Sequence, residues 1–422
     1  MSRLQPVRGT SDLLPENMAN HNLVINAARK ASACYGFQEM ATPIFEFLEV
    51  FSRPLGASSD IVTKENYSFE DRGGEMLTLR PENTAGVVRA MISGGLTQSL
   101  PLKYFYAGPM FRYERPQKGR MRQFHQVGIE YLGPDDALSD AETIACGARF
   151  LDSIGVLGDC DLHLNSLGDA ESRALYRDAL LEYLKKFSGD LSDDSKMRLL
   201  VNPLRILDSK DSGDRNILQN APKFPDYLNG VSQIRFENLT SALDRVGVAW
   251  FFNPLLVRGL DYYCHTAFEF VTNSLGAQGT VLGGGRYDGL SEMLGGPPVA
   301  GIGWAAGVER LTMLVEGVLP NSPKVAVVTA DDAAQQAAFH LAEQLRDAGI
   351  DIDFPTNGAM RKKLKKADKA NIHLVIILGS DELSKNTVLL RNLSNGSQEE
   401  IALDFADNGG LVAAIAKSLL AP

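Results

Sequence analysis

A run of alternating aromatic and polar residues between Leu100 and Leu132 restricts most strongly what this chain can fold into. The run is interrupted by a loop that contains Pro116 and Gly119, and the flanking stretches, FRYERP and MRQFHQVGIEYLG, are typical of extended strands. The pattern predicts a β-hairpin with a long loop. Because side chains alternate faces along a strand, one face of this hairpin is apolar and suits packing against helices.

The opposite face of the hairpin is unusually polar. The segment FRYERPQKGRMRQFHQ, residues 111 to 126, holds five cationic side chains and one carboxylate, although the whole chain has a formal net charge of -10. The polar face carries Arg112, Glu114, Arg122, Phe124, Gln126 and Glu130. Such a face is costly to bury unless it binds a polar ligand, so it is either an anion site or a solvated surface with a basic loop. The hairpin by itself leaves both interpretations open.

Patterns elsewhere divide the chain of 422 residues, which is too long for one core, into two or three domains. Apolar residues at helical spacing predict a helix from Pro15 to Tyr35, and the polar stretch from Gly168 to Gly230 predicts an inserted helical module. GVLPNSPK, residues 317–324, is typical of a linker. Beyond it, strand and helix patterns alternate, which predicts a small α/β domain with a mostly parallel sheet.

Cysteine and histidine spacing argues against structural metal or disulfides. The four cysteines form no CxxC pair, so a reducing compartment fits. His125 and His265 are expected to pack or to hydrogen-bond, because no second ligand lies at metal-binding spacing. The N-terminus lacks an apolar signal region, and the apolar run at 374–378 is too short to span a bilayer. We therefore expect a cytoplasmic protein with no membrane segment and no metal motif of its own.

Several segments resemble the motifs of one known family. FRYERPQKGR followed by RQFHQVGIE is similar to motif 2 of class II aminoacyl-tRNA synthetases, and specifically of the histidyl-tRNA synthetase family. Further segments follow in that family's order: GFQEMATPIFE (36–46), TLRPENTAGVVRA (78–90), VRGLDYYCHTAFE (257–269), GGGRYDGL (283–290) and GIGWAAGVERL (301–311). The C-terminal α/β pattern resembles the anticodon-binding domain of the same subgroup.

The resemblance implies a fold and an assembly. Overall the protein would be α/β. Residues 1–320 would form an α+β catalytic domain with a largely antiparallel sheet of the class II type, interrupted by the helical insertion at about 168–230. Residues 324–422 would form the anticodon-binding domain, with its mostly parallel sheet. Pro43, in the segment similar to motif 1, would lie at the interface of a homodimer.

The reaction implied by the resemblance is ATP-dependent ligation of L-histidine to tRNA(His). The carboxylate of histidine attacks ATP, pyrophosphate leaves, and the histidyl group of the adenylate then passes to a ribose hydroxyl of the tRNA as AMP is released. ATP is the implied cofactor, with Mg²⁺ bound to it. One alternative is a regulatory paralogue that binds histidine without acylating tRNA and typically lacks the anticodon domain. Another adenylate-forming enzyme is a more distant alternative.

The resemblance also assigns roles to single residues. Arg112 and Arg258 would be catalytic, holding the α-phosphate and the reacting carboxylate. The histidine pocket would consist of Glu82, Asn83, Thr84, Arg112, Gln126, Glu130, Arg258, Tyr262, Tyr263 and Tyr287. The ATP site would consist of Arg112, Glu114, Arg120, Phe124 and Arg310. The loop residues Arg115, Gln117 and Lys118 would contact the tRNA.

Some of these segments keep simpler interpretations. Tyr262 and Tyr263 fit packed strand residues, GGGRYDG by itself is typical of a turn, and RKKLKKADK (361–369) fits either a solvated helix or a contact with the tRNA backbone. Two residues depart from the family pattern. Asn83 stands in RPENT where RPEGT is usual, and asparagine tolerates a left-handed turn better than most residues. Trp304 replaces a smaller aromatic residue.

Overall fold

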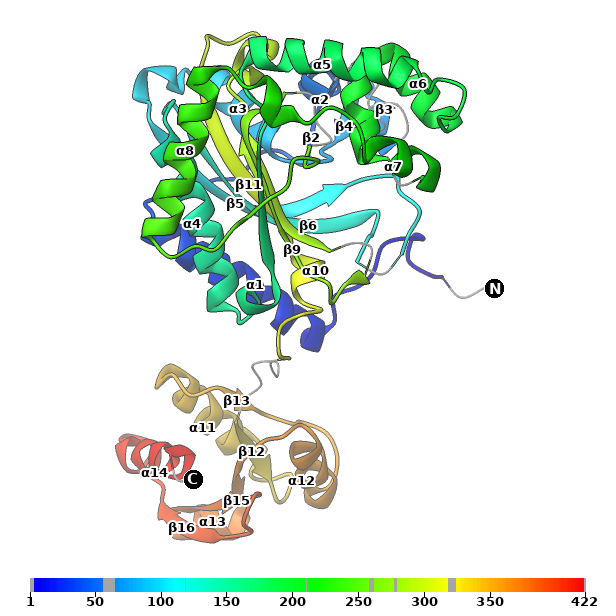
Figure 1. Cartoon of the computed structure of the whole chain (residues 1–422). Coiled ribbons are helices and arrows are strands. Elements are labelled where there is room, and N and C mark those ends of the chain that lie inside the picture. Colours follow the sequence, from blue (N-terminus) through cyan, green and yellow to red (C-terminus); the bar gives the residue numbers. More distant parts are fainter. Residues whose placement is uncertain are drawn as a thin grey trace. The chain divides into compact units, whose positions relative to one another are not determined.

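The chain forms two compact units, Met1–Leu319 and Pro320–Pro422 (Figure 1). The computed structural model describes residues 4–55, 65–117, 119–209, 211–257, 262–276, 279–317 and 324–420. Most of the linker expected at 317–324 lies outside these residues. Within the described ranges, no helix has the length and apolar character needed to cross a membrane.

An eight-stranded sheet forms the centre of the first unit. Its strands lie in the order β1 (Gln38–Glu39), β5 (Leu102–Phe111), β6 (Gln123–Leu132), β11 (Gly301–Gly307), β10 (Thr280–Arg286), β9 (Cys264–Val271), β7 (Asp161–Ser166) and β8 (Phe251–Phe252). Neighbouring strands are antiparallel except at the two edges, where β1 pairs with β5 and β7 pairs with β8 in parallel. The predicted, largely antiparallel sheet is therefore confirmed.

The predicted hairpin is the β5–β6 pair, but its first strand is shorter than expected. β5 ends at Phe111, so Arg112 and Glu114 lie beyond the strand and not within it. The cause is a contact from outside the hairpin, because the backbone N–H of Tyr113 donates to the carbonyl of Glu65 at 2.6 Å. The basic segment therefore lies beyond the end of the strand, in a loop that other parts of the chain hold in place.

Helices α1 (Pro15–Cys34), α4 (Ala137–Ser153) and α8 (Gly230–Arg245) cover one face of this sheet (Figure 1). The α1 bounds agree closely with the predicted helix from Pro15 to Tyr35. Trp304 lies in this core, where its Nε1 donates to the carbonyl of Thr143 at 3.1 Å and its ring stacks on Phe150. A Cβ at Gly147 of α4 would lie 3.2 Å from Leu282 and 3.4 Å from Nε1 of Trp304, so this glycine allows close packing of α4 on the sheet.

A second core lies on the opposite face, against Tyr106 and Met110 of β5. It is covered by α2 (Glu49–Leu55), α3 (Thr84–Ser93) and α9 (Leu290–Met293), beside a small sheet in the order β2 (Phe45–Phe47), β4 (Met76–Leu79) and β3 (Tyr67–Glu70). Between β7 and α8 the chain forms α5 (Ala170–Lys185), α6 (Asp193–Val201) and α7 (Ser212–Leu218). Shorter helices are η2 (Leu96–Ser99), η3 (Leu157–Asp159), η4 (Pro203–Asp208), η5 (Phe224–Tyr227) and α10 (Val308–Leu311).

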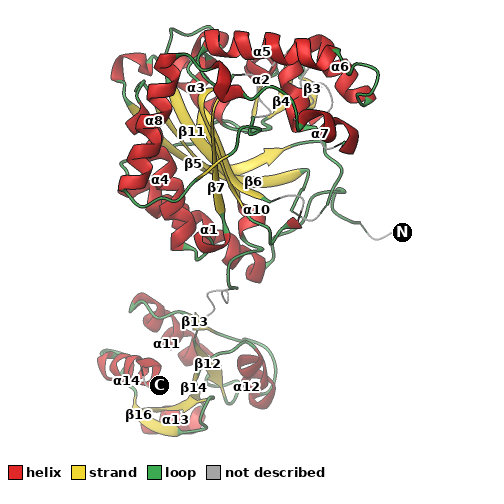
Figure 2. Cartoon of the chain, viewed as in Figure 1, coloured by secondary structure: helices red, strands yellow, loops and turns green. Residues whose placement is uncertain are grey.

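The second unit is a five-stranded sheet in the order β13 (Ile352–Asp353), β12 (Val325–Thr329), β14 (Leu374–Leu378), β15 (Thr387–Asn392) and β16 (Gln398–Ala402). Helices α11 (Gln335–Asp347) and α14 (Gly409–Leu420) pack on one face and α12 (Met360–Lys369) on the other, with α13 (Ser380–Lys385) after β14 (Figure 2). β13, β12 and β14 are parallel, but β15 and β16 are antiparallel. The sheet is thus mixed and not mostly parallel, because short connections favour antiparallel pairing after β14.

Candidate active site

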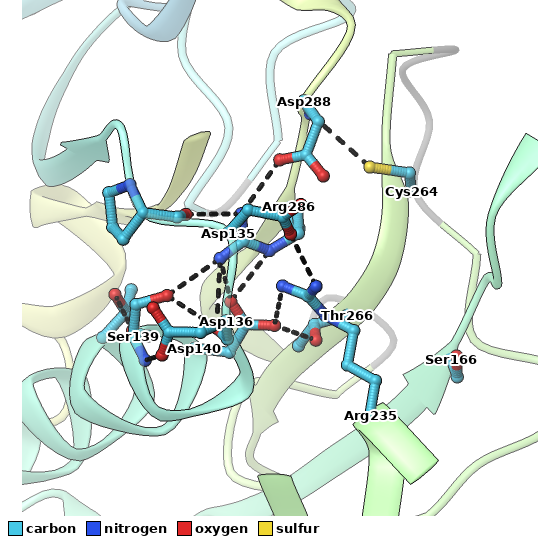
Figure 3. Close-up of polar contacts among 12 residues, drawn as sticks. Asp135, Asp136, Ser139, Asp140, Ser166, Arg235, Cys264, Thr266, Arg286 and Asp288 are labelled. Carbon is cyan, nitrogen blue, oxygen red and sulfur yellow. Dashed lines mark hydrogen bonds and ion pairs between the residues drawn. The ribbon is translucent and has the colours of Figure 1, made fainter. Parts of the chain in front are cut away.

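Arg286, at the end of β10, is fully buried and lies at the centre of a polar network (Figure 3). Its guanidinium donates to Asp140 of α4 and to Asp288, each at 2.9 Å, and to the carbonyl of Pro134 at 3.0 Å. Asp140 also accepts a hydrogen bond of 2.5 Å from the hydroxyl of Thr266 in β9. The segment GGGR is therefore a strand, and its arginine joins the sheet to α4.

Glu130 of β6 is buried among hydroxyl groups. Its carboxyl group accepts from the hydroxyl of Thr84 at 2.6 Å and from the hydroxyl of Tyr287, while the hydroxyl of Tyr106 lies 3.4 Å away. Burial raises the pKa of Glu130 to about 8, although these hydrogen bonds oppose the rise. Near neutral pH the carboxyl group therefore holds a proton, which it can share with a ligand.

Glycines make the floor on which this cluster lies. A Cβ at Gly303 of β11 would collide with the carboxyl group of Glu130, and one at Gly128 of β6 would collide with the hydroxyl of Tyr106. Because only glycine lacks a Cβ, these positions let two large polar side chains lie flat against the sheet. The buried cluster thus depends on backbone positions as well as on its polar groups.

The N-terminus of α3 lies beside Glu130, because Thr84 at its start donates to that carboxyl group. The buried carboxylate of Glu82 accepts from the backbone N–H groups of Thr84, at 2.6 Å, and of Ala85, at 3.0 Å. Burial raises the pKa of Glu82, while these hydrogen bonds and the charge of Arg112 oppose the rise. Two carboxyl groups and the hydroxyl of Thr84 are thus gathered in one buried region.

Asn83 has a different orientation. Its φ is −119°, so this residue needs no left-handed turn. Its side-chain Oδ1 accepts from the hydroxyl of Thr42 at 2.6 Å and from Arg80 at 3.3 Å. Asn83 therefore anchors the start of α3 to the neighbouring segment.

Gln126 Oε1 is buried and has no hydrogen-bond partner among the described residues. The ring of Tyr262 lies 4.8 Å from that of Tyr263 and 6.0 Å from that of Tyr287. A buried polar atom without a partner costs about 1–3 kcal/mol, so such atoms are typical of a ligand site. The unpaired oxygen of Gln126 lies on the face of β6 that also carries Glu130, which favours a polar ligand there.

A cluster of guanidinium groups lies along the loop and the start of α10. Arg120 pairs with Glu114 at 3.0 Å, and Arg112 lies 4.0 Å from the same carboxylate. Arg112 also lies over the ring of Phe124, at 5.3 Å from its centre. Burial and the neighbouring Arg120 and Arg112 lower the pKa of Arg310, while Glu114 raises it. The guanidinium groups of Arg112, Arg120 and Arg310 repel one another. The cluster therefore suits a ligand with several negative charges, such as a polyphosphate.

The remaining predicted residues divide into two groups. Arg115 and Gln117 are exposed on the loop, and Gln117 is bridged through its backbone to Arg120. Arg258 and Lys118 lie outside the residues that the structure describes.

Two residues of the site were not predicted. Tyr106 lies opposite Gly128 in the β5–β6 register, and a glycine facing an aromatic residue across a predicted hairpin was the available signal. Arg286 gave no such signal, because Asp140 is 146 residues away in the sequence.

Comparisons with known proteins agree over nearly the whole chain. A family model described as histidyl-tRNA synthetase matches residues 9–311, and one described as anticodon binding domain matches residues 324–408. A curated histidine–tRNA ligase of Rhodospirillum rubrum is 53% identical over 404 residues, which cover 96% of this chain and 97% of that protein. One of Gluconobacter oxydans is 52% identical and covers 95% and 97%.

Solved structures give the same picture. The structure of apo S. aureus histidyl-tRNA synthetase matches with a TM-score of 0.81 at 34% identity, over 98% of this chain and 99% of that one. A protein of Bacillus halodurans, described as an ATP phosphoribosyltransferase regulatory subunit/histidyl-tRNA synthetase, matches with a TM-score of 0.64 over 90% of this chain and 99% of that one. Its identity is only 21%, so this second match concerns the fold alone.

Proposed function

The chain belongs to the histidyl-tRNA synthetase family and ligates histidine to tRNA, and we propose that it does so through histidyl-adenylate formed from ATP in the buried site around Glu130. The observation that carries this proposal is the buried carboxyl group of Glu130 among hydroxyl groups, together with the guanidinium cluster. The pocket suits an imidazole ring, which offers a donor and an acceptor, and the cations suit the phosphates of ATP.

In this proposal Glu130 faces one ring nitrogen of histidine and Tyr263 faces the other, while Tyr262 and Tyr287 line the pocket. The proton held by Glu130 supports this arrangement, because a carboxyl group and an imidazole share one proton readily. An amino acid without matching polar groups would leave those of the pocket unpaired. Such pockets reject analogues by roughly 10⁴–10⁵ without a separate editing site.

The α-amino group of histidine would be held by Glu82, Thr84 and Gln126. Glu82 is fixed by the start of α3, and Gln126 Oε1 is a buried acceptor that lacks a partner among the described residues. Asn83 would contribute by fixing α3 and not by touching the substrate.

In the first chemical step, a carboxylate oxygen of histidine attacks the α-phosphorus of ATP. The bond from that phosphorus to the bridging oxygen breaks, and pyrophosphate leaves. Arg112, and by family resemblance Arg258, would stabilise the charge that develops there. Positioning and electrostatic stabilisation account for most of the rate in such phosphoryl chemistry.

The nucleotide would lie along the guanidinium cluster. Adenine would stack between Phe124 and Arg310, and Glu114 would accept from its amino group. Glu114 pairs with Arg120 at 3.0 Å, so Arg120 would exchange that carboxylate for the terminal phosphates of ATP. The exchange would leave neither charge unpaired.

Mg²⁺ would arrive with ATP, where it neutralises phosphate charge. Glu269 of β9 would be a protein ligand of this ion. It interacts electrostatically with Arg310, and its carboxylate accepts a hydrogen bond of 2.9 Å from the hydroxyl of Thr280. Carboxylate oxygens are the protein ligands that Mg²⁺ prefers.

In the second step the tRNA ribose hydroxyl attacks the carbonyl carbon of the adenylate, and AMP leaves. The loop residues Arg115, Gln117 and Lys118 are proposed to guide the acceptor end of tRNA(His). Arg115 and Gln117 are exposed, which supports this role.

The second unit offers a site for the other end of the tRNA. A pocket of about 550 Å³ opens at the carboxyl ends of the parallel strands β12 and β13 and is lined by Phe339, Phe354 and Lys363, among others. The ring of Phe339 is 53% exposed, which leaves it free to stack on a base. The buried ammonium of Lys363 donates to the hydroxyl of Thr329 at 2.6 Å. We propose that this pocket takes an unstacked base, with the cations of α12 near the backbone.

The small sheet supports a homodimer. Cross-strand pairing places Phe45, Phe47 and Phe69 on one face of β2–β4–β3, with exposed fractions of 56%, 54% and 45%. A cluster of exposed aromatic rings is typical of a protein interface. We propose that a second copy of the chain covers this face, which adjoins Pro43.

ATP–pyrophosphate exchange with each of the twenty amino acids tests the function. Exchange should depend on histidine, and no exchange with histidine would exclude the ligase. If the protein bound histidine but neither exchanged pyrophosphate nor charged tRNA, the regulatory interpretation would replace it. The match of residues 324–408 to an anticodon binding domain favours the ligase, because the paralogue typically lacks that domain.

A further inference from the structure

Three potential metal ligands from distant parts of the sequence meet behind the guanidinium cluster. His21 comes from α1, His125 from β6 and Glu309 from α10, and the ligand atoms that they offer all lie within 4.8 Å of one another. The rings of His21 and His125 are 4.5 Å apart, edge to face. Nδ1 of His125 lies 2.8 Å from Oε1 of Glu309.

His21 is the informative member of this cluster. It is 4% exposed, and neither Nδ1 nor Nε2 has a hydrogen-bond partner among the described residues. A packed histidine normally satisfies at least one ring nitrogen, because a buried polar atom without a partner is costly. Two unpaired nitrogens, with the ring against His125 in the cluster, therefore indicate a ligand that the protein chain does not supply.

The carboxylate of Glu309 is held beside His125, where it could also bind a metal ion. Both of its carboxylate oxygens accept from the backbone N–H of His125, at 3.0 and 2.9 Å, which fixes the carboxylate beside the imidazole. Such support of a ligand by a neighbouring group is common around bound metals.

Two imidazoles and one carboxylate select among cations. Ring nitrogens favour Zn²⁺ and similar transition metals, whereas Mg²⁺ and Ca²⁺ prefer oxygen. Zn²⁺ with bonds of about 2.0–2.1 Å holds tetrahedral ligand atoms about 3.4 Å apart, so small side-chain rotations would close the cluster. Spacing along the sequence could not reveal this set, since each ligand comes from a different element.

We propose that His21, His125 and Glu309 form a site for one Zn²⁺-class transition-metal ion, with water in the fourth position. The ion would join α1, β6 and α10. It would lie on the opposite side of β6 from Phe124 and next to Arg310, so its effect would be to stiffen the support of the nucleotide site and not to take part in the chemistry.

Metal binding to the full chain tests this proposal. The protein is stripped with a chelator, given Co²⁺ or Zn²⁺, desalted, and analysed for bound metal and for the visible bands of four-coordinate Co²⁺. Every protein carries Cys34→Ser, because Cys34 is an exposed free thiol that could bind metal itself. We expect one ion per chain, and His21→Phe should weaken binding by at least about 10-fold.

The control is His163→Ala. His163 lies on β7, away from the cluster, and hydrogen-bonds to Asn253, so its loss should leave metal binding unchanged. Equal binding by the His21→Phe variant would overturn the proposal. If that variant does not fold, the Cys34→Ser protein with His21 unchanged still tests the site. Failure of this folded protein to bind Co²⁺, or binding with the spectrum of the hydrated ion, would refute the proposal.

Discussion

Arg286 directs both its Nε and its Nη2 at Oδ1 of Asp140, and both side chains are fully buried. Removing one partner of a buried ion pair costs up to about 3–5 kcal/mol, and here Asp288 remains as the second carboxylate partner of Arg286. Asp140→Ala should therefore lower the free energy of unfolding of the first unit by up to that amount. Urea unfolding followed by tryptophan fluorescence measures it, because both tryptophans of the chain, Trp250 and Trp304, lie in that unit.

The matched control for this prediction is Arg177→Ala. Arg177 pairs with Asp178 at 3.0 Å, but both side chains are mostly exposed. An exposed pair contributes little, so the change should stay within about 0.5 kcal/mol. Equal effects of the two substitutions would show that burial does not give the Arg286 pair its importance.

Histidine binding should depend on pH through Glu130, whose pKa is raised to about 8. Between about pH 6.5, the usual pKa of an imidazole, and about pH 8, the free carboxyl group and the free ligand hold one proton in total, as the complex does. Below this window a proton must be released on binding, and above it one must be taken up. Affinity should fall about tenfold per pH unit on either side.

Glu130→Gln separates this effect from other titrations. The variant should bind histidine more weakly, and it should lose the alkaline fall in affinity, because the amide does not titrate. Calorimetry of histidine binding across pH measures both changes. The α-amino group of the ligand titrates equally with either protein, so it cancels in the comparison. An unaltered alkaline limb, or an effect mainly on ATP affinity, would contradict the assignment.

Arg112→Ala should reduce histidine-dependent ATP–pyrophosphate exchange by about 10²–10³, which is the usual cost of losing one donor to a developing charge. Its guanidinium lies over Phe124 and near Glu114, and the charge would be lost where phosphate is expected. Arg177→Ala again serves as the control. Near-normal exchange by a folded Arg112→Ala protein would remove this residue from the catalytic step.

The sequence predicted those elements of the fold that depend on residues close together in the chain. The hairpin, the helix from Pro15 and the alternation in the second unit all follow from local periodicity. Contacts between distant segments escaped prediction. The end of β5 depends on Glu65, and the buried role of Arg286 depends on Asp140. The anchoring of Asn83 on Thr42 is another such contact, since 41 residues separate the two.

Phe339→Ala should raise KM for tRNA while leaving ATP–pyrophosphate exchange unchanged, because the pocket lies in the second unit. Loss of one stacked base costs about 1–3 kcal/mol, or roughly 5- to 150-fold. Met360→Ala is the control, since Met360 is an apolar residue of the same unit, 37% exposed and outside the pocket lining. An unchanged KM for tRNA would place the base elsewhere.

Phe47→Asp should convert the protein to a monomer in sedimentation experiments, because a charge would be buried at the proposed interface. Phe251→Asp alters a ring of similar exposure, 55%, on another sheet edge and should leave the assembly unchanged. A dimer that persists in Phe47→Asp would show that the small sheet faces something other than a second copy.

A single nucleotide change turns any glycine codon into an alanine codon, and at Gly128 and Gly303 that smallest of substitutions would be among the most damaging. The added methyl group would occupy the space of Tyr106 or Glu130. Neither glycine needs to touch a substrate, yet both define the volume in which one is chosen. In a genetic screen, loss-of-function alleles should therefore map to these silent-looking backbone positions as densely as to the reactive side chains.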